Sequence, residues 1–261
     1  TTNQDIAAEV IYLAANGYLT IKRLETTKLL LFKGTDYEFT KLDKGPTTLA
    51  PQTKAFLDEL FPGGVNTNKL SELKKDISFG KALIKIKSEV MKELVKSGYY
   101  KINPTTAQVL WFVGGVMIGF ALAFILGNVI GYLGGIAGVL SGIIVVIFSF
   151  IMPARTQKGT DAATNIEGLK LYLTVAEKDR LEFHNAPEKN PQQFEMLLPF
   201  AIALGVGTAW ASQFKDLSQA PSWYNDSSGT AFNVAIFSSS MNDFSSSMQS
   251  VASSATTSSS G

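Results

Sequence analysis

The sequence between Lys101 and Arg155 contains no Asp, Glu, Lys, Arg or His, although charged residues make up 17% of the chain. A membrane-spanning helix needs about 20 mostly apolar residues. As a single helix, about 45 apolar residues would extend for about 68 Å, whereas a bilayer core is about 30 Å thick. The segment 106–152 is therefore predicted to form two membrane-spanning helices, at about 108–127 and 131–152, joined by a tight turn.

Glycines recur at helical spacing in both predicted spans. They are Gly115 and Gly119 in the first span, and Gly134, Gly138 and Gly142 in the second. Small residues at this spacing let helix backbones approach closely in a membrane. The pattern favours packing of the spans on each other or on a further span, and an interface with a partner or second copy is the alternative. Neither span carries an ionisable residue, so the pair is predicted to be an anchor and not an ion or proton pathway.

Basic residues gather outside both ends of the apolar segment and are absent from the turn between the spans. Lys101 precedes the first span, and Arg155 and Lys158 follow Pro153, which ends the second. Because Lys and Arg concentrate in cytoplasmic loops, both flanks are predicted to be cytoplasmic. Lys101, Arg155 and Lys158 are candidate contacts for lipid headgroups.

The flank before the spans, 1–103, has the pattern of helices alternating with short strands. One local pattern occurs twice, as LAANGYLTI from Leu13 and as LVKSGYYKI from Leu94. A helix that ends at glycine and continues as an aromatic residue and a strand is typical of the step from third helix to wing in winged-helix modules. Two winged-helix-like units, at about 1–45 and 48–103, are therefore predicted.

A long helix is predicted at about 79–97, with lysines along one side. The lysines of this stripe are Lys81, Lys85, Lys92 and Lys96. A solvated helix face is the simplest interpretation, and contact with anionic lipid is the second. Nucleic-acid binding is not favoured, because the flank is only modestly basic and Arg23 is its one arginine.

The flank after the spans, 153–217, is predicted to be helical. An amphipathic helix at about 161–183 would bury a face that includes Ile166 and Leu173. A second uncharged stretch follows at 196–214. Its proline and glycines favour a cytoplasmic helix pair or a helix at the membrane interface, with a third span as the remaining alternative.

The last part of the chain, 218–261, is rich in serine, yet an amphipathic helix is predicted at about 231–252. Its apolar residues recur at alternating spacings of four and three. They are Phe237, Met241, Phe244, Met248 and Val251. Because serine is a mediocre helix former, this partner seam needs a surface to pack on, either the preceding helices or another protein.

Catalytic chemistry finds little support in the sequence. Cysteine is absent and His184 is the only histidine, so neither thiolate chemistry nor a histidine-based metal cluster is available within the chain. The glycines form neither a Walker loop nor a GxGxxG motif after a strand, and the glycine-rich stretches lie in the apolar spans. We therefore expect no enzyme activity, no catalytic or metal-binding residue and no cofactor.

Four stretches of the chain resemble a known family. They are DIAAEVIYLAANGYLTI, MPARTQKG, GLKLYLTVAEKDRL and FEMLLPFAIALGV. They are similar to segments of the predicted bacterial membrane proteins of domain-of-unknown-function family 2207, and the resemblance extends to about Phe214. It implies a cytoplasmic part, a membrane hairpin and a second cytoplasmic part, in a multi-pass protein of the bacterial inner membrane. It implies no binding or catalytic residue.

The same resemblance implies further regions that are absent from this sequence. Members of the family typically carry an extracytoplasmic β-rich domain and another membrane helix upstream, and a glycine-rich tail. The chain begins at Thr1 without methionine, so we expect it to be part of a longer protein.

The sequence thus predicts a mainly α membrane protein, in which a two-helix transmembrane hairpin is flanked by a cytoplasmic winged-helix-like α+β part and a C-terminal helical part. The favoured function is a non-enzymatic membrane-anchored scaffold or assembly component. Its expected partners are the lipid bilayer and a protein partner or second copy, with no small-molecule substrate. Two alternatives are a membrane-tethered winged-helix regulator that binds nucleic acid and an accessory subunit of a transport complex.

Overall fold

The chain folds into two compact units that do not follow its order. The computed structural model describes residues 4–28, 32–44, 49–150, 155–175, 190–214, 217, 219–227, 229 and 232–257. The first unit combines Thr1–Lys87 with Glu167–Gly261, and the second is Ser88–Ile166. The predicted regions follow one another along the chain, with boundaries at about residues 103, 153 and 217. In the structure, most of the first region packs together with the residues from Glu167 onward.

A four-stranded sheet in the order β3-β2-β1-β4 lies in the first unit. β1 (Leu19–Lys28) and β2 (Phe32–Lys41) pair antiparallel along their whole length. β3 (Thr67–Lys69) adds antiparallel to β2. β4 (Tyr224–Asp226) pairs parallel with β1, with Ile21 opposite Tyr224. The sheet therefore takes strands from both flanks of the apolar segment.

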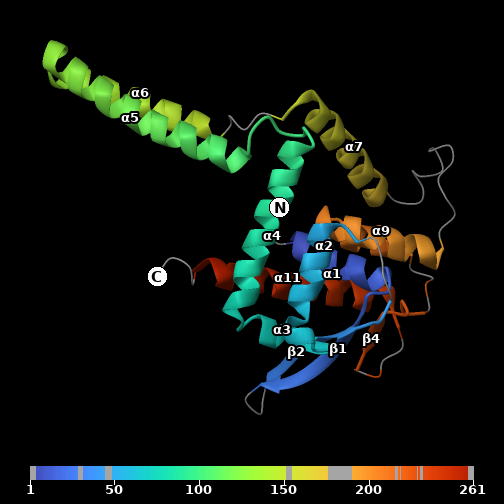
Figure 1. Cartoon of the computed structure of the whole chain (residues 1–261). Coiled ribbons are helices and arrows are strands. Elements are labelled where there is room, and N and C mark those ends of the chain that lie inside the picture. The colour runs from blue at the N-terminus through green and yellow to red at the C-terminus, as the bar shows by residue number, and fades with distance from the viewer. Residues whose placement is uncertain are drawn as a thin grey trace. The chain divides into compact units, whose positions relative to one another are not determined.

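Four helices from both flanks complete the core of this unit. They are α1 (Gln4–Ala15), α9 (Pro191–Ala203), α10 (Gly207–Ser212) and α11 (Val234–Thr257). α1 contacts α9 and α11, and these three helices lie beside the strands (Figure 1). α10 contacts α9 and α11. α9 and α10 are the predicted helix pair, separated at Gly205 with φ +71°. Leu198 and Trp210 are buried in the core.

Along the sequence, the stretch from β2 to the apolar segment also forms four helical elements. They are α2 (Pro51–Leu60), the 3₁₀ turn Pro62–Gly64, α3 (Leu70–Leu73) and α4 (Ile77–Lys96). The predicted long helix is α4. Asp76 begins this helix, because its Oδ1 accepts a hydrogen bond from the Ser78 backbone N–H at 2.8 Å. The hydrogen bonds from Ser78 lower the pKa of Asp76.

The repeated glycine–aromatic pattern produces a strand only once. Gly17 has φ +75° and leads into β1. Gly98 has φ +78°, but Tyr100 makes a single bridge to Arg155 and no strand follows before the next helix. Among the described residues this single bridge is the pairing that follows Gly98. Residues 151–154, which precede Arg155, lie outside the described residues. The winged-helix assignment of this flank remains a prediction.

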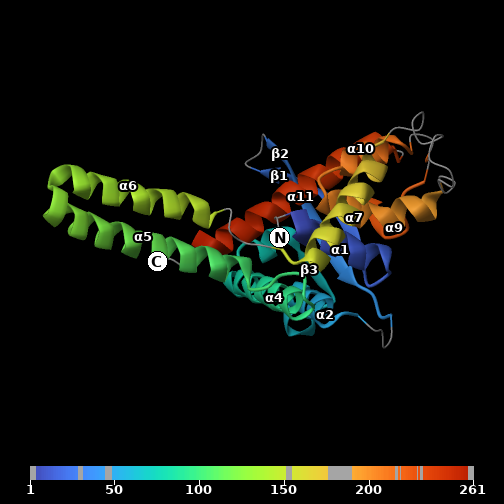
Figure 2. The ribbon, with the colours of Figure 1, turned by 90° about the horizontal axis from the view of Figure 1, so that it is seen from above.

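The second unit contains α5 (Pro104–Ile130) and α6 (Tyr132–Ser149), which run side by side in opposite directions (Figure 2). Gly131, with φ +80°, is the only residue between them. Both helices are long and apolar enough to cross a membrane, and among the described residues they are the two that meet this criterion. The stretch 196–214 therefore does not supply a third candidate span.

α7 (Gln157–Thr174) follows the helix pair and differs from its predicted amphipathic face. Leu173 is fully buried, as predicted, but Ile166 is 51% exposed. Ile166 belongs to the second unit, whereas Leu173 packs in the core of the first. The predicted continuation to residue 183 lies outside the described residues.

Candidate functional site

The contact between α5 and α6 is made by glycine backbones. All five predicted packing glycines, Gly115, Gly119, Gly134, Gly138 and Gly142, face the opposite helix. A Cβ built on Gly138 would lie 2.2 Å from the backbone N of Ala123, and one on Gly142 would lie 2.5 Å from Cα of Gly119. These spaces admit no side chain, so the pattern packs the two helices on each other.

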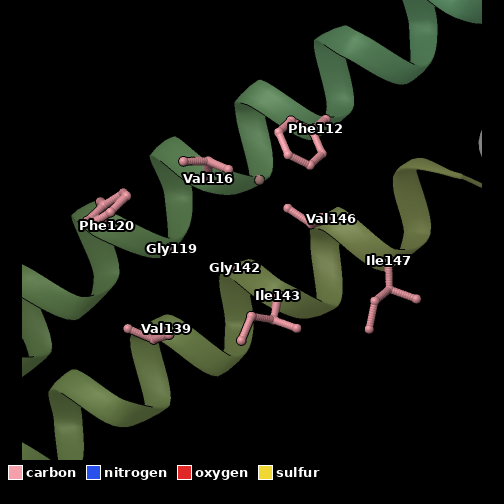
Figure 3. A pocket seen from close by; sticks show the side chains of 10 residues that line it. Phe112, Val116, Gly119, Phe120, Val139, Gly142, Ile143, Val146 and Ile147 are labelled. Atoms are coloured by element: carbon pink, nitrogen blue, oxygen red, sulfur yellow. The ribbon is translucent and has the colours of Figure 1, made fainter.

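An apolar groove of about 240 Å³ lies between the same two helices (Figure 3). Gly119 and Gly142 face each other between the helices, and larger side chains surround them. These side chains are Phe112, Val116 and Phe120 from α5, and Val139, Ile143, Val146 and Ile147 from α6. The groove has no charged lining residue, so it suits an acyl chain or an apolar side chain and not an ion.

A second contact joins the residues that precede α5 to the residues that follow α6, at the end of the helix pair opposite Gly131. The Thr156 hydroxyl donates to the carbonyl of Gly98 at 2.6 Å, and its oxygen accepts from the backbone N–H of Gly159 at 3.1 Å. The Thr156 backbone N–H donates to the carbonyl of Tyr99 at 3.2 Å. These bonds, with the Tyr100–Arg155 bridge, form what we call the base contact.

The predicted headgroup residues surround the base contact. Lys158 Nζ donates to the carbonyl of Ser97 at 2.7 Å and lies 4.6 Å from the ring centroid of Tyr99. Arg155 and Lys101 are exposed. Lys158 is therefore held by protein groups, whereas the charged ends of Arg155 and Lys101 are open to solvent or to headgroups.

A Gly159→Ala substitution is expected to break the base contact, because its Cβ would lie 2.1 Å from the carbonyl oxygen of Tyr99. Overpacking of this kind costs about 1–3 kcal/mol. Hydrogen exchange measured by mass spectrometry should show faster exchange of the Thr156 amide. Gly168→Ala, in the same helix with nothing within 4 Å of its Cβ, is the control. Equal exchange in both variants would contradict the assignment.

The lysine stripe of α4 is exposed at all four predicted positions, Lys81, Lys85, Lys92 and Lys96. Lys92 Nζ lies 2.9 Å from a carboxylate oxygen of Glu89, and Lys96 Nζ lies 3.9 Å from one of Glu93. Two of the four charges are thus partly offset within the helix. This arrangement favours the solvated face over a phosphate-binding surface.

The predicted partner seam of α11 lies in the core of its own chain. Phe237, Met241, Phe244 and Met248 are 0–3% exposed. The Phe244 ring packs edge-on against Tyr37 and Phe39, with centroids 5.0 and 6.0 Å apart. In this conformation the seam is not open to a separate partner, because the first unit itself provides the packing surface. The side chain of Val251 lies outside the described residues.

A partly buried polar cluster where the sheet meets β4 and α11 was not predicted. Arg23 Nη1 lies 3.2 Å from Asp226 Oδ2, and the Tyr37 hydroxyl donates to the carbonyl of Ser240 at 2.7 Å. Burial raises the pKa of Tyr37. Burial alone would lower the pKa of Arg23, but Asp226 more than offsets it and the pKa is raised. The cluster therefore keeps a neutral phenol and an ion pair where β4 and α11 meet β1 and β2.

The described residues contain no group of three His, Cys, Asp or Glu side chains that could hold a metal ion. His184, the only histidine, lies outside the described residues.

Comparison with known protein families finds a match over most of the chain. The family described as predicted membrane protein (DUF2207), C-terminal domain, matches residues 1–214. The chain belongs to the DUF2207 family. No curated protein and no solved structure was found to match it. The DUF2207 match ends at Phe214, so β4 and α11 lie beyond it, although their side chains complete the core.

Proposed function

We propose that this DUF2207 chain is a non-enzymatic membrane-anchored scaffold whose two flanks fold into one cytoplasmic unit. The observation that carries the proposal is the composition of the first unit. β1 pairs with β4, and α1 packs on α9 and α11, although α5 and α6 lie between these partners in the sequence. Two flanks that share one core must lie in the same compartment.

Shared packing of the flanks constrains the helix pair in a bilayer. If both flanks lie on one side, α5 and α6 enter and leave the membrane from that side, and Gly131 lies at the far end. The base contact supports this arrangement, because it joins the residues before α5 to those after α6. Lys101, Arg155 and Lys158 lie at this end, which favours the cytoplasmic face of a bacterial inner membrane.

The scaffold role follows from how the anchor is built. Glycine packing and the base contact fix α5 and α6 as a pair. The pair holds the first unit at the membrane surface, where Arg155 and Lys101 can reach anionic headgroups. A unit tethered in this way stays near the membrane, where its exposed faces are accessible to other proteins or to a second copy.

Labelling of single cysteines tests this topology directly, since the chain has no cysteine of its own. Three exposed positions serve: Ser88, Asn128 and Ser246. In intact cells, a membrane-impermeant maleimide should label Asn128→Cys, near the turn between α5 and α6. Ser88→Cys and Ser246→Cys should be labelled only after lysis. Labelling of Ser88→Cys and Ser246→Cys from opposite sides would refute the shared unit, and protection of all three would refute the two spans.

A further inference from the structure

The apolar groove between α5 and α6 begins near the end of the helix pair that adjoins the base contact. Along α6 its lining runs from Val139 to Ile147, and α6 ends at Ser149, about 3 Å further on. These eight residue steps extend for about 12 Å. Half of a bilayer core is about 15 Å thick. The groove therefore has the position and depth of a lipid chain in the leaflet beside the base contact.

The shape of the groove limits what can fill it. Its volume of about 240 Å³ is too small for a helix, whose diameter with side chains is about 10 Å. Gly119 and Gly142 hold the two backbones together, so the groove cannot widen between them (Figure 3). An unfilled space deprives its lining atoms of dispersion contacts on one side. A single flexible hydrocarbon chain can supply those contacts along the whole groove.

Positive charge gathers at the same end of the helix pair. Residues 94–160 contain Lys96, Lys101, Arg155 and Lys158, and they contain no Asp or Glu. Lys96 lies 3.9 Å from Glu93, and Lys158 donates to the carbonyl of Ser97. Arg155 and Lys101 are exposed, and the bridge from Arg155 to Tyr100, the neighbour of Lys101, brings their backbones close together. Two exposed cations thus lie beyond the groove in the same unit.

We propose that the groove and these two cations form one binding site for an anionic phospholipid. An acyl chain of the lipid occupies the groove, and its phosphate lies near Arg155 and Lys101. This inference rests on the proposed anchoring of α5 and α6 in a bilayer. Charge complementarity selects the occupant, because an apolar side chain from a protein would fill the groove but leave both cations unused.

The first turns of α5 link the two parts of the site. Pro104 begins α5 and Phe112 is its first groove residue, so about 12 Å of helix separates them. Trp111, just before the groove, is partly exposed and is of the residue type found at the level of headgroups. Arginine and lysine side chains are long enough to extend toward that level from the base contact. One phospholipid, with its phosphate and acyl chain, can therefore contact both parts.

Native mass spectrometry of the full chain in detergent tests the site. The chain is mixed with equal amounts of dioleoyl phosphatidylglycerol and dioleoyl phosphatidylcholine, which have identical acyl chains but different net charges. We expect one retained lipid per chain, with phosphatidylglycerol in about tenfold excess, because each nearby Lys or Arg favours an anionic headgroup. Equal retention of both lipids, or retention of neither, would overturn the proposal.

Groove-filling substitutions locate the acyl chain. Val116→Trp and Ile143→Trp add bulk to the groove from opposite helices and should reduce retained lipid several-fold. Met117→Trp is the control, because Met117 is 67% exposed and does not line the groove. Equal retention in all three variants would exclude the groove as the site. Spectra in which the unsubstituted chain is a lipid-free dimer, and Val116→Trp a monomer, would assign the groove to a second copy and overturn the proposal.

Neutralising substitutions test the headgroup part without altering the helix pair. Lys101→Gln combined with Arg155→Gln should bring the ratio of phosphatidylglycerol to phosphatidylcholine close to one. Lys81→Gln, which removes an exposed lysine of α4 in the first unit, should leave the ratio unchanged. An unchanged ratio in the double variant would overturn the assignment of these two cations. Lipid retention in detergent does not depend on sidedness, which cysteine labelling reports, so failure of the lipid site and failure of the anchored topology give different results.

Discussion

A Phe244→Ala substitution is expected to destabilise the first unit by about 3–5 kcal/mol. The side chain is fully buried, and its ring contacts Tyr37 and Phe39 from the neighbouring strand. Its removal leaves a cavity between α11 and the sheet, which these two large rings have little freedom to fill. α11 should therefore detach from β2 at a lower denaturant concentration than in the unsubstituted chain.

Urea unfolding of the full chain in detergent measures this loss. Trp210 and Trp223 are buried in the first unit, so their fluorescence reports its unfolding. Ser246→Ala, at an exposed position of the same helix, is the matched control and should change the free energy of unfolding by less than about 0.5 kcal/mol. Similar midpoints for Phe244→Ala and Ser246→Ala would show that α11 does not pack on β2.

The two apolar helices could be predicted from sequence because their signals are local. The charge-free interval between Lys101 and Arg155 gives the length of two spans, and the structure places α5 and α6 within it. Glycine spacing likewise predicts which faces meet. The spacing of Gly138 and Gly142 within one helix is enough to predict that this face packs closely on another helix, as it does on α5.

Contacts between the flanks could not be predicted in the same way. β4 has three residues, and its pairing with β1 depends on a partner about 200 residues earlier. No periodicity can be recognised in so short a strand. The seam of α11 was predicted from its spacing, but its partner is encoded in the alternation of Tyr37 and Phe39 on β2. Only the fold shows that these two patterns pack together.

The two glycine–aromatic sequences show how context decides a local signal. Gly17 and Gly98 adopt the same left-handed conformation after a helix. Leu19 then pairs with Lys41 at the start of a ten-residue strand, whereas Tyr100 makes one bridge, to Arg155, within the part of the chain that the structure describes. Strand formation needs a neighbour for its backbone hydrogen bonds, and the sequence around Gly98 does not reveal whether one is present.

The base contact was partly visible in the sequence. The MPARTQKG stretch contributed to the family resemblance without a role for Thr156 or Gly159. The structure gives Thr156 three backbone partners and shows that Gly159 leaves room for the Tyr99 carbonyl. A threonine and glycine three residues apart are common, so their spacing alone could not have indicated this contact. Pairing with residues before α5 was required to recognise it.

A Gly138→Val substitution is expected to separate α5 from α6 where Gly138 faces Ala123. Even the Cβ of the new side chain would lie 2.2 Å from the Ala123 backbone N, and no flexible side chain can yield there. Overpacking costs about 1–3 kcal/mol where neighbours can adjust, so we expect at least this loss in the free energy of helix packing. Gly131 still joins the helices at one end, so separation would be greatest near the middle of the pair.

Cross-linking across the groove measures this separation. Val116 and Ile143 line the groove from opposite helices, so Val116→Cys and Ile143→Cys in one chain should join through a short bis-maleimide in detergent (Figure 3). Gly138→Val should reduce the yield several-fold. Gly114→Val adds the same atoms where nothing lies within 4 Å, and should leave the yield unchanged. Both substitutions change helix propensity equally. A loss of yield confined to Gly138→Val would therefore show that close backbone contact holds α5 and α6 together. An equal loss in both variants would attribute the effect to helix propensity and contradict the prediction.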